Sequence, residues 1–139
     1  MEHARFGNNI IARIDKGEEI ISSIEKIVNS ENISLASINA LGAVGEFTVG
    51  VFKTKEKKYY SNSFKGDFEI VSLHGTVSTM EDRPYFHLHM SAADENANVF
   101  GGHLNQAIVS ATCEMVITVI DGKVSREYND NIGLNLFKF

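Results

Sequence analysis

The feature that most constrains the fold is a period-two alternation of side chains through the second half of the chain. FEIVSLHGTVS (residues 68–78) and PYFHLHMSA (84–92) both alternate, so successive side chains would point to opposite faces of an extended strand. A long apolar run, AIVSATCEMVITVI (107–120), predicts a further strand. Most of the core must therefore come from a sheet.

One segment, DKGEEIISSIEKIVNSEN (15–32), has helical periodicity instead. Asp15 and Glu18 resemble a capping box at its start. Its apolar side chains recur every three or four residues and form one stripe, made of Ile20, Ile21, Ile24, Ile27 and Val28. We expect one main helix over about residues 17–30, covering one face of the sheet. The pattern predicts an α+β domain with a central, largely antiparallel sheet.

Length and composition place the chain among globular proteins. We find no linker or repeat, so residues 1–139 are expected to form a single domain. Hydrophobic residues make up 43% and charged residues 22%. No apolar run is long enough to span a bilayer, and the N-terminal stretch lacks the features of a signal peptide. With a lone cysteine, Cys113, these features predict a cytoplasmic protein without intrachain disulfides.

Three of the five histidines gather in FHLHMSAADENANVFGGHL (86–104). His87 and His89 are two residues apart, so both imidazoles would project from one strand face. Gly101 and Gly102 let the backbone bend or approach closely just before His103. Neutral imidazole binds zinc and similar ions, and three protein ligands leave a coordination position open, as in catalytic sites. The three histidines therefore predict a site for a divalent transition metal, with zinc as the first candidate.

The competing interpretation is that His87 and His89 are exposed residues on a solvated strand face. For the metal site, Glu69 and Glu114 are the candidate catalytic groups, as proton donors or acceptors. Glu69 shares its predicted strand face with Val71, Leu73 and Val77, so we expect it to be partly desolvated. Both carboxylates could equally be edge residues paired with lysine or arginine. Apolar neighbours along its strand predict Cys113 to be a core residue.

In the order GDFEIVSLHGTVS, FHLHMSAADENANVFGGHL, ATCEMVI, the sequence resembles the PPC (plants and prokaryotes conserved) domain family. The resemblance covers nearly the whole chain. Its most specific part is the Gly-Gly-His segment that follows the His-x-His strand. It implies an α+β fold with a central antiparallel sheet, and a stand-alone protein of the prokaryotic type that forms homotrimers.

The resemblance also bears on the site. Some members carry a metal on the histidines that match His87, His89 and His103. The fold is similar to that of acetolactate decarboxylase, a zinc enzyme with a His-x-His motif and a later histidine. Fold similarity transfers no reaction, so whether this chain is an enzyme stays open. Candidate residues for trimer contacts are Phe100, Phe137 and Phe139.

DNA binding is implied only by analogy with plant members, in which an AT-hook precedes the domain. This chain has no Arg-Gly-Arg element, and its four arginines are scattered. Its formal charge of -5 works against attraction to phosphates. The densest basic stretch, KTKEKKYY (53–60), is expected to be a solvated hairpin tip.

Three functions therefore stay open. The first is a metal-binding protein with a small-molecule or enzymatic role, whose substrate the sequence does not identify. The second is a DNA-associated regulatory or assembly protein. The third is a scaffold in which the histidines are structural.

Overall fold

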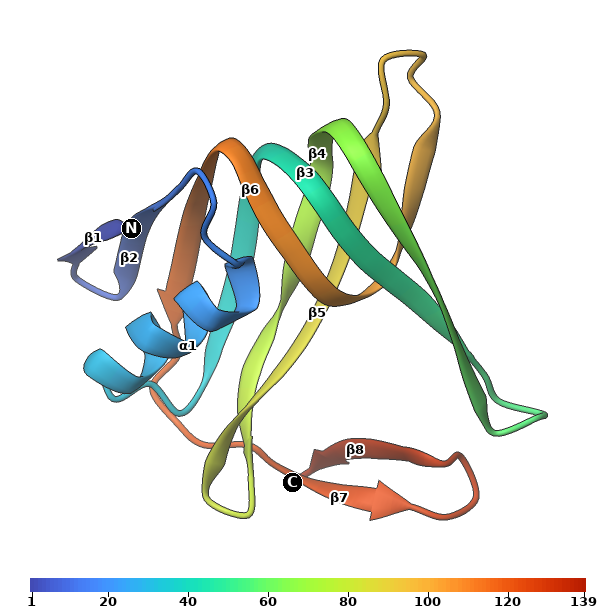
Figure 1. Cartoon of the computed structure of the whole chain (residues 1–139). Coiled ribbons are helices and arrows are strands. Elements are labelled where there is room, and N and C mark those ends of the chain that lie inside the picture. Colours follow the sequence, from blue (N-terminus) through green and yellow to red (C-terminus); the bar gives the residue numbers. More distant parts are fainter.

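Strands make up most of the molecule, and one short helix lies against them (Figure 1). The computed structural model describes residues 1–139. In chain order the elements are β1 (Glu2–Phe6), β2 (Asn9–Asp15), α1 (Ile20–Ser30), β3 (Ala36–Lys53), β4 (Lys58–Met80), β5 (Arg83–Ala93), β6 (Val99–Val119), β7 (Ser125–Asn129) and β8 (Leu134–Lys138). The expected α+β fold with one covering helix is confirmed.

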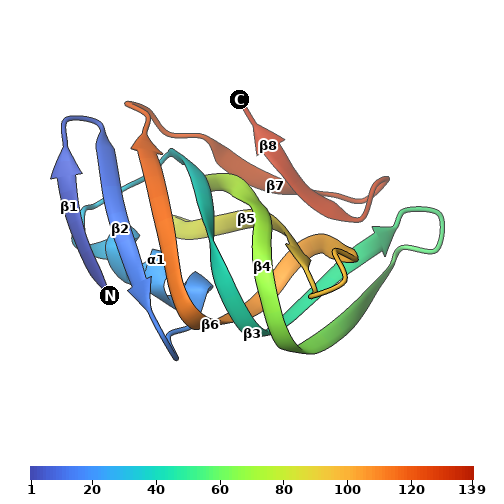
Figure 2. The same cartoon turned by 90° about the horizontal axis from the view of Figure 1, so that it is seen from above.

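The sheet is antiparallel except at one point, where Thr79 of β4 meets Ser125 of β7 in parallel. The four long strands close a circuit: β3 pairs with β4 and β6, and β5 pairs with the same two. Figure 2 shows from above how β3, β4, β5 and β6 curl around one another. This circuit gives the sheet an inner and an outer face along β5 and β6.

Strand β3 contains three glycines, Gly42, Gly45 and Gly50. It stays one strand, with register shifts between Ala40 and Gly42 and between Val44 and Glu46. At Gly42 φ is +140°, and a side chain there would collide with the backbone of Thr112 in β6. The irregularities in β3 are therefore bulges, which bend the strand without ending it.

Helix α1 begins at Ile20, later than the expected start near residue 17. Its N-cap is Glu19, whose carboxylate accepts hydrogen bonds from two backbone N–H groups of the first turn, at 3.1 and 2.7 Å. Glu18 does accept a hydrogen bond from the backbone N–H of Asp15 at 2.9 Å. That contact belongs to the turn before the helix, so Asp15 is not the cap.

The core lies between α1 and the inner face of the sheet. The buried side of the helix consists of Ile20, Ser23, Ile24, Ile27 and Val28. Strand β5 contributes Leu88 and Met90, each only 2% exposed.

No helix in the structure is long and apolar enough to cross a bilayer.

Strands β7 and β8 form a C-terminal hairpin that pairs with itself from Ser125 to Lys138. Besides the single parallel contact with β4, side-chain hydrogen bonds hold it to the main sheet. Arg126 Nε donates to Ser78 Oγ at 2.8 Å, and Asn135 Nδ2 donates to Tyr85 Oη at 3.4 Å. The hairpin therefore lies beside the start of β5, on the side away from the core.

Candidate metal centre

Strand β5 places His87 and His89 on the outer face of the sheet. Between and after them, Leu88 and Met90 point into the core. The two imidazole rings lie 5.2 Å apart between centroids. The expectation that both project from one face is confirmed, and its cause is the period-two pleat.

Strand β6 supplies the third imidazole. His103 is the direct cross-strand neighbour of His89, so the strand pairing itself brings the two rings together. A side chain at Gly102 would lie 2.5 Å from the carbonyl oxygen of Gly50 in β3. The glycine therefore permits a close approach of strands, and not a bend, because its φ is not in the left-handed region.

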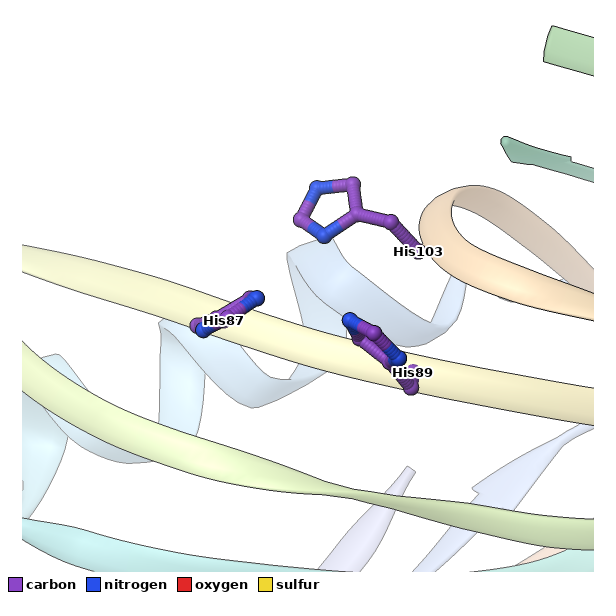
Figure 3. Close-up of side chains that lie close together, drawn as sticks. All are labelled: His87, His89 and His103. Atoms are coloured by element: carbon purple, nitrogen blue, oxygen red, sulfur yellow. The ribbon is translucent and has the colours of Figure 1, made fainter. Parts of the chain in front are cut away.

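The three imidazoles face one another (Figure 3). Ring centroids of His103 lie 5.4 Å from His87 and 5.7 Å from His89, and one nitrogen from each ring falls within 4.8 Å of the others. A tetrahedral ion with bonds of about 2.0–2.1 Å needs nitrogens about 3.3 Å apart. The nitrogens would therefore have to move closer together around such an ion.

A cavity of about 770 Å³ adjoins the three histidines. One wall is the β3–β4 hairpin, with Tyr59 and Phe52 among its residues, and the other is the C-terminal hairpin, with Arg126 and Phe137. Tyr59 Oη donates to Asn105 Oδ1 at 2.6 Å, which holds its ring against that of His103. No aspartate or glutamate lines this cavity.

The surroundings favour neutral imidazoles. Burial lowers the pKa of His87, and the nearby His103, Arg126 and His89 lower it further. Burial lowers the pKa of His103 as well, with His89 adding to the effect. Neutral imidazole is the form that binds metal, so both lowered pKa values keep these ligands available to more acidic pH.

Neither predicted proton-transfer residue reaches this cavity. A register shift between Ile70 and Ser72 reverses the alternation of β4, so Glu69 and Val71 are exposed while Leu73 is buried. The expected partial desolvation of Glu69 was therefore wrong. Glu114 is exposed on β6 opposite Arg13 and lines a separate hollow beside β1 and β2. The structure brings the three predicted ligands together, but it places neither predicted carboxylate beside them.

Two residues near the site were missed. His74 of β4 is the cross-strand neighbour of His89, with ring centroids 6.3 Å apart, and its Nδ1 lies 3.2 Å from Ser72 Oγ. Antiparallel pairing of the two alternating stretches could have indicated it. Arg126 reaches the cavity from the C-terminal hairpin, and no local pattern in the sequence points to that placement.

Cys113 lies fully buried on the inner face of β6, as expected of a core residue. Burial raises the pKa of its thiol to about 12, with the charge of Glu114 adding to the rise. It therefore takes no part in the chemistry of the outer face.

Solved structures show the same fold. A candidate DNA-binding protein from Bacteroides thetaiotaomicron matches with a TM-score of 0.96 at 33% identity, over 99% of this chain and 96% of that one. A metal-containing protein from Archaeoglobus fulgidus matches with a TM-score of 0.90 at 29% identity, over 97% and 96%. No curated protein matches the sequence.

The fold is also similar to that of acetolactate decarboxylase from Bacillus subtilis subspecies spizizenii. The TM-score is 0.59 at 19% identity, over 84% of this chain and 54% of the enzyme. The predicted likeness in fold is thereby confirmed, and it extends to the fold alone. The model of the Plants and Prokaryotes Conserved domain, abbreviated PCC or PPC, matches residues 1–121, and the chain belongs to this family.

Proposed function

We propose that His87, His89 and His103 bind a divalent transition metal ion, zinc in the first instance, for a small-molecule or enzymatic role. The observation that carries the proposal is the convergence of three imidazole nitrogens within 4.8 Å on the wall of a cavity. Such a ligand set leaves a coordination position open. The metal-containing relative from Archaeoglobus fulgidus supports it as well.

The donor set fits this class of metal. Three imidazoles without a carboxylate suit zinc, copper, nickel or iron, whereas magnesium and calcium prefer oxygen ligands. When bound, the ion would supply Lewis acidity, which polarises a carbonyl group or makes a water molecule more acidic. The imidazole nitrogens, which lie within 4.8 Å of one another, would move closer together around such an ion.

The chain itself would bind and orient the small molecule. Apolar residues of both hairpins, Val51, Phe52, Leu134, Leu136 and Phe137, would exclude water from the cavity. Tyr59 and Tyr85 place hydroxyl groups in the same walls. A volume of about 770 Å³ falls within the range of small-molecule sites.

Metal content by inductively coupled plasma mass spectrometry tests the proposal. Untagged wild type, after incubation with zinc and removal of free ions, should hold close to one ion per chain. The His87→Ala, His89→Ala double variant should hold almost none, because a single imidazole binds weakly. His3→Ala is the matched control, since His3 faces Glu31 on the other side of the molecule and should leave the content unchanged. Equal metal in wild type and double variant would sink the proposal.

We also propose a homotrimer in solution. Large apolar side chains stay exposed in the single chain, among them Leu41, Val71 and Phe139. Phe100, expected as a contact residue, instead stacks on Phe64 with ring centroids 4.6 Å apart. In a single chain neither Glu69 nor Glu114 lines the cavity, so a catalytic role for either would need a second copy. A monomer in sedimentation velocity at micromolar concentration would contradict the trimer.

DNA association is the second candidate, favoured by the candidate DNA-binding protein from Bacteroides thetaiotaomicron. In this chain the basic stretch forms the exposed tip between β3 and β4, and Lys53 and Lys58 both pack on the ring of Tyr60. Such a tip offers few phosphate contacts. DNA binding that weakens as salt rises would favour this function over the small-molecule one.

A further inference from the structure

The cavity beside the histidines contains one permanent positive charge, that of Arg126. Two aromatic rings contact its guanidinium: the centroid of Tyr85 lies 4.5 Å from Cζ and that of Phe137 lies 4.3 Å away. Nε donates to Ser78 Oγ at 2.8 Å, and Nη1 donates to the backbone oxygen of Asn135 at 2.9 Å. These contacts fix the plane and direction of the group.

This cation has no counter-ion. Arg5 and Arg13 form ion pairs with carboxylates, whereas Arg126 forms none, although it is half-buried. Its Nη2 is buried and has no hydrogen-bond acceptor. Of the five guanidinium N–H donors, the protein pairs one on Nε and one on Nη1, which leaves three without an acceptor. A desolvated guanidinium without an anion is unfavourable, so an anionic group is the expected occupant.

The rest of the cavity has the same preference. Its lining includes no aspartate or glutamate, in a chain whose formal charge is -5. Arg126 and the three histidines line the same cavity. An anion in this cavity would therefore face the guanidinium on one side and the imidazoles on the other.

We propose that the cavity binds a small carboxylic acid that carries a further oxygen outside its carboxylate, such as a carbonyl oxygen. The carboxylate pairs with Arg126, and this second oxygen faces the three histidines. A planar carboxylate suits the guanidinium fork. The apolar residues Leu134, Leu136 and Val51 would contact a short hydrocarbon body. Pairing with Arg126 stands independently, whereas the role of the second oxygen rests on the proposed metal function.

The C-terminal hairpin is then a specificity element. Residues 122–139 lie beyond the part of the chain that the family model matches, yet this hairpin supplies Arg126, Asn135 and Phe137 to the cavity.

Isothermal titration calorimetry with 4-methyl-2-oxopentanoate tests the proposal, using its uncharged amide as the matched probe. Wild-type protein stripped of metal with a chelator should bind the acid at least about tenfold more tightly than the amide, because only the acid forms a charge-assisted pair. This comparison needs no variant, so it does not depend on how a substitution affects folding. Equal affinity for acid and amide would overturn the proposal, as would binding of inorganic phosphate in preference to the acid.

Variants locate the anion. Arg126→Gln should weaken binding of the acid by about tenfold or more and leave the amide unchanged. Arg126→Lys should recover part of the affinity. Arg83→Gln is the control, since it removes an equal charge from an exposed position that does not line the cavity. Loss of affinity in Arg83→Gln equal to that in Arg126→Gln would contradict a specific pair.

Zinc loading separates this inference from the metal function. If zinc tightens binding of the acid in wild type, both hold. If the acid binds through Arg126 but zinc neither binds nor changes the affinity, the anion site stands and the metal function fails. If zinc binds but acid and amide do not differ, the metal function stands and the role of Arg126 fails.

Discussion

The two faces of β5 and β6 use adjacent residues for different purposes. On the inner face, Leu88, Met90 and Cys113 are buried within one core cluster. On the outer face, His87, His89 and His103 line a cavity that also contains Arg126 but no acidic side chain. Because successive side chains of β5 from His87 to Met90 alternate between the two faces, stability and chemistry can be changed separately within that strand.

Thiol labelling should give the largest difference between the faces. With a pKa raised from 9.0 to about 12, Cys113 has a thiolate fraction lower by about a thousandfold, and burial also blocks access. We expect iodoacetamide to label native protein at least that much more slowly than urea-unfolded protein. A Cys113→Ala, Glu114→Cys variant moves the thiol to the exposed face and should label rapidly. Rapid labelling of native Cys113 would break the comparison.

Truncation of adjacent residues should change stability on the inner face only. Leu88→Ala removes a side chain that is 2% exposed and should lower the free energy of unfolding by about 2–5 kcal/mol. His89→Ala, next to it on the exposed face, should change it by about 0.5 kcal/mol or less in metal-free protein. Urea unfolding of both variants without metal measures the difference. Equal losses would mean that the histidine face is also structural.

We expect the histidines of the outer face to make a smaller contribution, seen in the pH dependence of the free energy of unfolding. The pKa values of His87 and His103 lie below the ordinary 6.5, mainly through burial. At pH values between each lowered pKa and 6.5, the unfolded chain binds more protons than the folded chain. The free energy of unfolding therefore rises with pH in this window, and above it these two histidines add no further pH dependence.

Urea unfolding of metal-free protein between about pH 5 and about pH 8 covers this window. A His87→Gln, His103→Gln double variant should lose part of the slope, whereas His3→Gln should keep it. An identical slope in wild type and the double variant would contradict the assignment.

Much of the site could be predicted because its main contacts are local or nearly so. The His-x-His alternation determines that His87 and His89 share a face wherever the strand lies. The glycine pair correctly indicated a close approach near His103, confirmed at Gly102 against Gly50. The face of Glu69 could not be predicted, because one register shift after Ile70 reverses the alternation.

The sequence by itself determined the element types, the single apolar stripe of α1 and the two faces of β5, since periodicity depends only on local backbone geometry. Only the tertiary structure decided that His74 lies opposite His89, that Glu69 and Glu114 stay away from the cavity, and that Arg126 enters it. Those placements depend on strand register and on how the C-terminal hairpin packs against β4 and β5. Contacts between residues far apart in the chain set both, and no local pattern records them.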